Sequence, residues 1–285
     1  MHDVEGGGSS ILTVPPGVWT LARNLRLTAP GMSLCGAGMR ATRLKLVGGA
    51  ASSVVTVNAS GVVLRRLTIC GNIDDPPTGA RPHGLVIKAD PAQTNLQDLV
   101  VESVCGYGIL IRGRGDDRGA FVDVRLHNVV VQNCGNDGID FKALRHPRSS
   151  VKGSLCARAF LRNIVVRDFS LFKPHPDLRG GGECGVDVRG QVYMIGIEIL
   201  GVKPGDFGKP GALGVHFRKE NPAPEQHGRG SGGSSLQNYY ISLRAPADIG
   251  GKRGRALAIG GNVKRRIAIG EGHVVDEFGD ALNEK

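Results

Sequence analysis

The stretch Gly138-Ile139-Asp140-Phe141-Lys142 belongs to a short unit that occurs five times along the chain, and this repeat decides the fold. Each copy reads glycine, apolar residue, variable residue, apolar residue, basic residue, which is the alternation of a β-strand with one buried face. The other copies are Gly84-Leu85-Val86-Ile87-Lys88, Gly108-Ile109-Leu110-Ile111-Arg112, Gly185-Val186-Asp187-Val188-Arg189 and Gly214-Val215-His216-Phe217-Arg218, with a degenerate copy at Ala256-Leu257-Ala258-Ile259-Gly260. One such strand cannot bury its apolar face alone, so the repeat predicts the stacked coils of a solenoid.

A second repeated string supplies another strand to each coil. Its copies are Leu96-Gln97-Asp98-Leu99-Val100-Val101, Leu126-His127-Asn128-Val129-Val130-Val131, Leu161-Arg162-Asn163-Ile164-Val165-Val166 and Leu236-Gln237-Asn238-Tyr239-Tyr240-Ile241. The third residue is always Asp or Asn, and these residues tolerate the left-handed backbone of a tight bend. We therefore predict that Asp98, Asn128, Asn163 and Asn238 form a ladder of equivalent bends in successive coils.

The two repeats together predict an all-β chain that forms one right-handed parallel β-helix, with long loops along the walls of a groove. The composition agrees, because 44 glycines and only 5% aromatic residues suit many turns around a core of small branched side chains. The intervals between the repeated glycines are unequal, which places the variation in the loops. We expect a leader over residues 1–10, the β-helix over residues 11–276 and a tail over residues 277–285.

The opening coils carry a resemblance to a known group of proteins. They contain Leu12-Thr13-Val14-Pro15-Pro16-Gly17-Val18-Trp19, then Leu34-Cys35-Gly36-Ala37-Gly38 and Thr42-Arg43-Leu44. This chain resembles the pectate-lyase-like superfamily of β-helix proteins, whose members commonly begin with Pro-x-Gly-x-Tyr, followed by Leu-x-Gly-x-Gly and Thr-x-Leu; Trp19 stands where Tyr is usual. The superfamily includes lyases, hydrolases, epimerases and phage tail proteins. Its members usually carry a capping helix before the first coil, and here we expect a truncated start, a covering chain or a homotrimer at that end.

Period two sends the apolar residues of each unit inward and leaves two columns on the outer face of the sheet. The first column is Val86, Leu110, Asp140, Asp187, His216 and Ala258, and the second is Lys88, Arg112, Lys142, Arg189 and Arg218. Because coils stack about 4.8 Å apart, we expect the two aspartates and the histidine to lie within about 10 Å of one another, facing solvent. The predicted catalytic residues are Asp140, Asp187, Lys142, Arg189, His216 and Arg218.

Long insertions border these middle coils, at residues 143–148, 171–179 and 220–234. Long loops beside one stretch of a regular scaffold commonly form the walls of a cleft. His146 and His175 lie in two of these insertions. We therefore predict Lys88, Arg112, His146 and His175 as substrate-binding residues.

Two reactions fit the predicted groove. The segment Asn136-Asp137-Gly138-Ile139-Asp140 is similar to the Asn-Thr-Asp-Gly-x-Asp motif of polygalacturonase-type hydrolases, a likeness that implies acid and base roles for the two aspartates. The later motifs of those enzymes, Asp-Asp and Gly-His-Gly, are replaced here by Glu183-Cys184-Gly185 and Ala212-Leu213-Gly214.

The second reaction is β-elimination from a uronic acid, which needs a group that neutralises the sugar carboxylate, a base for the C5 proton and an acid for the leaving oxygen. Arg189, or Ca²⁺ held by Asp137, Asp140 and Asp187, supplies the first part. Lys142, Arg218 or His216 supplies the base, as basic side chains do in related β-helix lyases. The same groups serve C5 epimerisation. We therefore expect a lyase acting on an acidic polysaccharide, with a hydrolase, a C5-epimerase and a non-catalytic phage-tail or surface glycan-binding module as alternatives.

The formal net charge of +10 favours a polyanionic partner. An acidic polysaccharide suits the groove better than nucleic acid, because acids lie among its bases and few aromatic residues are present for base stacking. The sequence contains no apolar run long enough to cross a membrane, and Met1-His2-Asp3-Val4-Glu5-Gly6 lacks the order of a secretory signal. The localisation therefore stays open between a phage virion, secretion by another route and a chain with a truncated start.

The six cysteines contain no Cys-x-x-Cys pair, so the sequence predicts buried thiols instead of a zinc site. Cys105 and Cys134 each precede a repeated glycine in neighbouring coils. We expect these two side chains to approach each other as free thiols.

Overall fold

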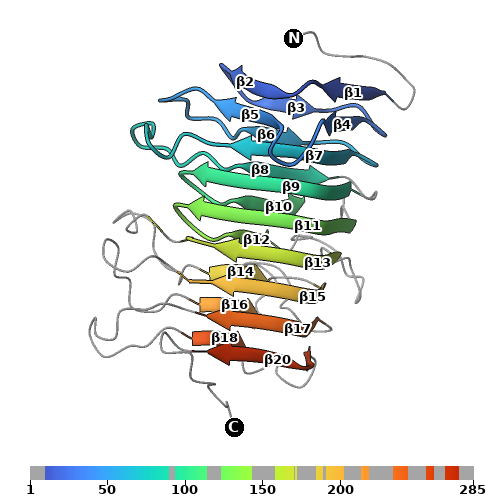
Figure 1. Cartoon of the computed structure of the whole chain (residues 1–285), viewed down its shortest axis with the longest axis vertical. Helices are drawn as coiled ribbons and strands as arrows, with labels where there is room; N and C mark the ends of the chain where they lie inside the picture. The colour runs from blue at the N-terminus through green and yellow to red at the C-terminus, as the bar shows by residue number, and fades with distance from the viewer. Residues whose placement is uncertain are drawn as a thin grey trace, which may run out of the picture.

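Parallel strands stacked along one long axis make up the molecule (Figure 1). The computed structural model describes residues 10–89, 94–113, 123–142, 158–169, 171, 184–188, 191–201, 213–217, 234–242, 255–259 and 267–275. In these ranges the regular elements are all strands, and no helix is long and apolar enough to span a membrane.

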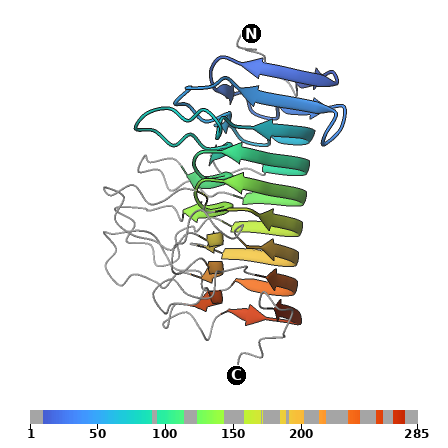
Figure 2. The same ribbon diagram turned by 60° about the vertical axis from the view of Figure 1, so that its left-hand side comes forward.

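The strands of the described residues form two sheets that run the length of the stack (Figure 2). The shorter sheet contains β3 (Leu25–Leu27), β6 (Val55–Val57), β8 (Leu85–Ala89), β10 (Ile109–Gly113), β12 (Ile139–Lys142), β14 (Cys184–Val188), β16 (Leu213–Phe217) and β18 (Arg255–Ile259), in that spatial order. The main path of the longer sheet is β1 (Ile11–Val14), β4 (Ser33–Gly36), β7 (Val63–Cys70), β9 (Thr94–Val104), β11 (Asp123–Cys134), β13 (Arg158–Arg167), β15 (Gln191–Leu200), β17 (Ser235–Ser242) and β19 (Ala268–Ile269). Beside this path, β2 (Gly17–Leu21) pairs with β5 (Thr42–Leu46), β5 also pairs with β7, and β20 (Gly272–Val275) pairs with β17.

Every strand pairs in parallel with the equivalent strand of a neighbouring coil, as β10 does with β8 and β12. Parallel pairing between strands so far apart in sequence requires a connection around the coil, and each coil supplies it through the other sheet. The apolar residues that alternate along each strand meet in one continuous core, which includes Phe141, Val186 and Phe217. These observations confirm the predicted all-β parallel β-helix.

The ladder of bends is also confirmed. Asp98, Asn128, Asn163 and Asn238 have φ values of +52°, +54°, +54° and +49°, and strand register aligns them at one position of the coil, with Gly196 in the coil between Asn163 and Asn238. Asn128 Nδ2 donates a hydrogen bond of 2.6 Å to Asp98 Oδ1. The ladder has two further members, Arg66 and Gly196, with φ values of +60° and +67°.

The five cysteines among the described residues are buried and free, and Cys156 lies outside those residues. Register pairs Cys134 with Val104, so Cys105 is displaced by one residue from the equivalent position that the sequence suggested. Burial raises the pKa of the Cys105 thiol to about 11, and burial also raises the pKa of the Cys134 thiol. Both thiols are therefore neutral at physiological pH.

Candidate functional site

Strand register aligns the first predicted column. Leu110 pairs with Asp140, Asp140 with Asp187, and Asp187 with His216. The column continues to Val86 at one end and Ala258 at the other. The variable residue of each unit therefore lies between two core residues of its strand and points away from the core, as the period predicts.

The exposure of this column differs from the expectation. Asp140 and Asp187 are each only 1% exposed, and the His216 side chain is 19% exposed. The prediction of a solvent-facing pair of carboxylates is therefore wrong. Period two shows on which side of a sheet a residue lies, but it carries no information on what covers that side.

Three carboxylates converge around β12 and β14. Asp137, Asp140 and Asp187 each offer an oxygen, and these oxygens lie within 4.8 Å of one another. Asp137 Oδ1 also accepts a 2.6 Å hydrogen bond from the backbone N–H of Cys184. Ligands at 2.3–2.6 Å from a shared Ca²⁺ are separated by at most about 5 Å, so the donor set fits the calcium site that the sequence predicted.

A second group of donors shares Asp187. His216 Nδ1 lies 3.8 Å from Asp187 Oδ1 and 3.9 Å from Cys184 Sγ, and donor atoms of all three residues lie within 4.8 Å of one another. Cys184 was not among the predicted site residues. A signal was present, because Cys184 precedes the repeated Gly185 as Asp137 precedes Gly138.

The position before each repeated glycine defines a third column, which the sequence analysis missed. Its members are His83, Tyr107, Asp137, Cys184 and Leu213. The rings of His83 and Tyr107 stack with centroids 4.9 Å apart, and the Tyr107 backbone N–H donates to His83 Nδ1 at 3.1 Å. Beside them, Arg81 Nη1 donates to Asn136 Oδ1 at 2.9 Å. His83, Tyr107 and Arg81 thus lie in the coils on the N-terminal side of the carboxylate cluster.

The second predicted column is aligned as far as the structure describes it. Register pairs Lys88 with Arg112 and Arg112 with Lys142. The side chains of Arg112 and Lys142, together with Arg189, Arg218, His146 and His175, lie outside the described residues.

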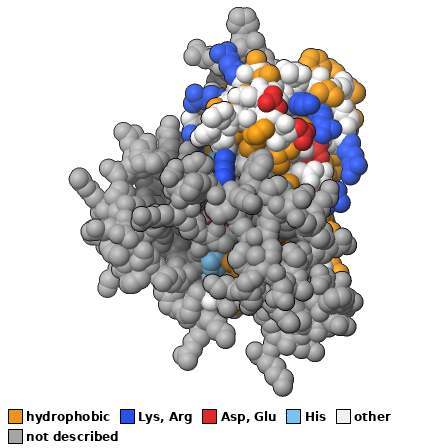
Figure 3. Space-filling model, turned by 90° about the vertical axis from the view of Figure 1, so that its left-hand side faces the viewer, with side chains coloured by type: hydrophobic (Ala, Val, Ile, Leu, Met, Phe, Trp, Pro, Cys, Tyr) orange, Lys and Arg blue, Asp and Glu red, His pale blue; other side chains and the backbone are white. Residues whose placement is uncertain are grey.

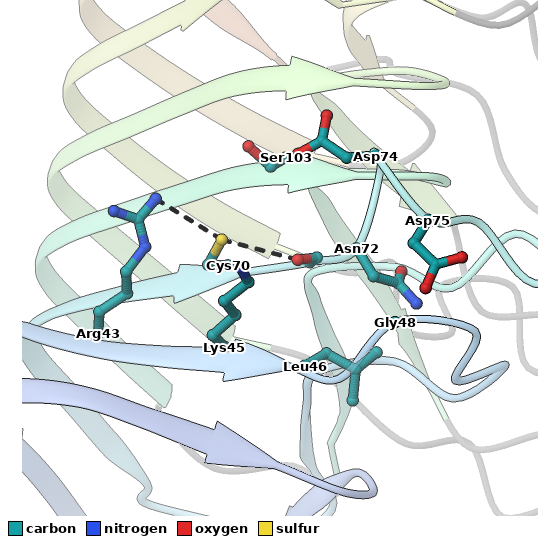
Figure 4. A pocket seen from close by; sticks show the side chains of 10 residues that line it. Arg43, Lys45, Leu46, Gly48, Cys70, Asn72, Asp74, Asp75 and Ser103 are labelled. Atoms are coloured by element: carbon teal, nitrogen blue, oxygen red, sulfur yellow. Dashed lines mark hydrogen bonds between the residues drawn. The ribbon is translucent and has the colours of Figure 1, made fainter.

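The N-terminal coils contain a separate cavity of about 330 Å³, which no sequence pattern indicated (Figure 4). Arg43 and Lys45 of β5 line one side, and Asp74 and Asp75 of the loop after β7 line the other. Arg43 is hydrogen-bonded to Glu102, and its Nη2 lies 3.6 Å from Cys70 Sγ. Basic and acidic side chains also lie close together on the face of these coils that Figure 3 shows.

Comparison with known proteins identifies the fold. No sequence family and no curated protein sequence matches the chain. A pectin methylesterase from Yersinia enterocolitica matches 99% of this chain over 89% of its own length, with 14% identity and a TM-score of 0.53. Full-length tailspike protein 2 from Escherichia coli O157:H7 bacteriophage CAB120 matches 94% of this chain, with 12% identity and a TM-score of 0.51; this chain covers 34% of the tailspike. The A-module of a mannuronan C-5 epimerase from Azotobacter vinelandii matches 94% of this chain over 89% of its own length, with 15% identity and a TM-score of 0.41.

At these identities the similarity concerns the fold, which agrees with the repeats, the parallel pairing and the opening motifs. The chain is a right-handed parallel β-helix protein, a fold that it shares with the pectin methylesterase and the tailspike.

Proposed function

We propose that the chain cleaves an acidic, uronate-containing polysaccharide by lyase-type β-elimination, and that Asp140, Asp187 and His216 lie at the centre of the reaction. The observation that carries the proposal is the alignment of these three residues in consecutive strands, with both carboxylates buried. Like charges placed directly opposite each other on paired strands destabilise a sheet, and burial adds a desolvation penalty. A stability role does not account for such an arrangement, which supports a functional role for the two carboxylates.

The cluster contains groups that can neutralise the sugar carboxylate and groups that can take the C5 proton. The sugar carboxylate is neutralised by Arg189 or by Ca²⁺ on Asp137, Asp140 and Asp187, whose oxygens suit that ion. The base for the C5 proton is Lys142, Arg218 or His216, and His216 Nδ1 lies 3.8 Å from Asp187 Oδ1. The aligned cations Lys88, Arg112 and Lys142 bind further carboxylates of the polymer along the groove.

The comparison with solved structures supports a polysaccharide as the substrate class, because one protein with the same fold is named a pectin methylesterase. The fold alone does not select a reaction. The assignment to elimination depends on the mixture of carboxylates, histidine and cations in the groove.

The test is incubation of the protein with a panel of uronate-containing polysaccharides. Elimination produces an unsaturated uronate with ultraviolet absorbance, hydrolysis produces reducing ends without that absorbance, and epimerisation changes the sugar signals in NMR spectra without cleavage. The proposal predicts absorbance on at least one acidic polymer. Reducing ends alone would favour the hydrolase, and binding without any product would favour a glycan-binding module.

Asp187→Asn tests the cluster itself. This change keeps the side-chain volume and removes one anion, so we expect turnover to fall by a factor of 100 or more with little change in melting temperature. Asp98→Asn is the matched control, because it makes the same chemical change in the ladder of bends, where Asn already serves in three other coils. Equal activity of wild type and Asp187→Asn on a cleaved substrate would remove this cluster from the reaction.

Arg112→Ala tests the cation column. Arg112 pairs with Lys142 but lies one coil before the carboxylates. We expect KM for the polymer to rise several-fold, and to rise most at low salt, while kcat stays close to that of the wild type. A fall in kcat with unchanged KM would place Arg112 in the chemical step instead.

A further inference from the structure

We propose that Cys184, Asp187 and His216 form a binding site for a divalent transition metal of the zinc class. The inference concerns residues of the same groove but does not rest on the proposed function, because metal binding can be measured without a polysaccharide. The sequence did not predict a zinc site, since the ligands come from three positions with no common motif. Strand register brings them together.

The distances fit a tetrahedral ion. Nitrogen, oxygen and sulfur ligands lie about 2.0–2.3 Å from Zn²⁺, so at tetrahedral angles any two of them are about 3.3–3.6 Å apart. The observed separations from His216 Nδ1 are 3.8 Å to Asp187 Oδ1 and 3.9 Å to Cys184 Sγ. All three donor atoms lie within 4.8 Å of one another, so the side chains need only move closer together to close the site around a metal.

The surroundings position these ligands. The backbone of Cys184 is fixed by the 2.6 Å hydrogen bond that its N–H donates to Asp137 Oδ1. Asp187 and His216 lie opposite each other on β14 and β16, with their flanking residues packed into the core. The His216 side chain is the most exposed of the three, which gives an ion an approach from solvent.

The donor types distinguish this site from the carboxylate cluster. Asp137, Asp140 and Asp187 offer only oxygen, which suits Ca²⁺. A thiolate and an imidazole select zinc-class ions and are poor ligands for calcium. Three protein ligands leave a fourth position, which in catalytic zinc sites is filled by water or substrate. Because the imidazole would bind through Nδ1, the role of base in the proposed elimination would pass from His216 to Lys142 or Arg218.

The experiment is titration of chelator-treated, full-length protein with Co²⁺. We expect one equivalent to bind, with visible bands of tetrahedral cobalt and a near-ultraviolet charge-transfer band from the thiolate, and we expect Zn²⁺ but not excess Ca²⁺ to abolish them. Cys184→Ser should lose the charge-transfer band, and both Cys184→Ser and His216→Gln should weaken binding by at least about 10–100-fold. Cys105→Ser is the matched control, because it changes another buried cysteine outside the site and should leave the spectrum unchanged.

If Cys184→Ser fails to fold, His216→Gln still decides the matter, because His216 is partly exposed and its replacement leaves the core intact. Cobalt bound without the charge-transfer band, or with the same band in Cys184→Ser, overturns the proposal, as does the absence of binding. Activity on a polysaccharide that survives complete chelation would refute a metal requirement but not the proposed function. Metal binding without any polysaccharide activity would support the metal site and count against the proposed function.

Discussion

One residue in each of six coils adopts a left-handed backbone at the same bend of the longer sheet. Four of these residues are Asp or Asn, which reach this conformation at low cost because their short polar side chains bond locally. Asn128 in addition donates a hydrogen bond between coils, to the Asp98 side chain of the preceding coil. Arg66 has no such local chemistry, and only the register of its strand shows that it belongs to the ladder.

Substitutions of Asn128 measure how much the left-handed backbone and the bond to Asp98 contribute to the stability of the bend. Asn128→Ala keeps a Cβ in a left-handed backbone and removes the bond to Asp98, so we expect the free energy of unfolding to fall by about 1–2 kcal/mol. Asn128→Gly loses the same bond without the steric penalty and should destabilise less. Chemical denaturation of both variants, with the exposed neighbour His127→Ala as a control, checks this order. Alanine that is tolerated as well as glycine would show that the bend imposes no strain.

At the scale of the strand, the repeated glycine of the shorter sheet is explained by close packing. A Cβ on Gly108 would lie 2.3 Å from Val131 Cγ1 and 2.6 Å from the carbonyl oxygen of Gly138. Gly84, Gly138 and Gly185 meet equivalent obstacles. The glycine that marks each unit in the sequence therefore lies where the backbone packs directly against core side chains and the backbone of the next coil, which leaves no room for a Cβ.

Gly108→Ala should accordingly be among the most destabilising single changes in the chain. The contacting atoms include backbone, which cannot move aside as a flexible side chain does, so we expect a loss of about 3 kcal/mol or more. Gly38→Ala is the control, because its new Cβ would lie at an ordinary 3.4 Å from Ala41 Cβ. Thermal melts of the two variants should differ by several degrees. Similar melting temperatures would contradict the packing explanation.

The strand is also the scale at which sequence reasoning succeeds and fails. Alternation alone placed Asp140, Asp187 and His216 in one column. It could do so because successive side chains of a β-strand point to opposite faces of the sheet. The same reasoning could not find Cys184 or Tyr107, which precede the repeated glycine and lie outside the alternation. It also missed the burial of the two aspartates, because covering depends on contacts made by other parts of the chain.

At the scale of the whole molecule, polar contacts join coils that are far apart in sequence. Glu102 of β9 binds Arg43 of β5 and accepts a 2.6 Å hydrogen bond from Gln132 of β11. Gln132 in turn accepts a 2.7 Å hydrogen bond from Arg167 of β13. In a solenoid each coil is stabilised by its neighbours, so such a network couples the N-terminal coils to the middle of the stack. No sequence pattern predicted it, because its members share no spacing.

The buried thiols of two successive coils make the stack sensitive to alkaline pH. Burial raises the pKa of Cys105 from 9.0 to about 11 and raises that of Cys134 as well. Between the unfolded and folded pKa values the native state binds more protons than the unfolded state, so stability falls as pH rises. The contribution of Cys105 is fully present below about pH 9 and is lost as pH rises through about 11. We expect the melting temperature to decline over this range.

Cys105→Ala isolates this effect from the titration of lysine and tyrosine. The variant lacks the thiol, so its melting temperature should start lower at pH 8, because Cys105 contacts Asn72, and should then decline less steeply than that of the wild type. The two curves should therefore converge toward pH 11. Scanning calorimetry from pH 7 to 11 under reducing conditions measures both slopes. Parallel curves would mean that the Cys105 thiol titrates alike in the folded and unfolded chains, and that burial in this coil does not hold its proton.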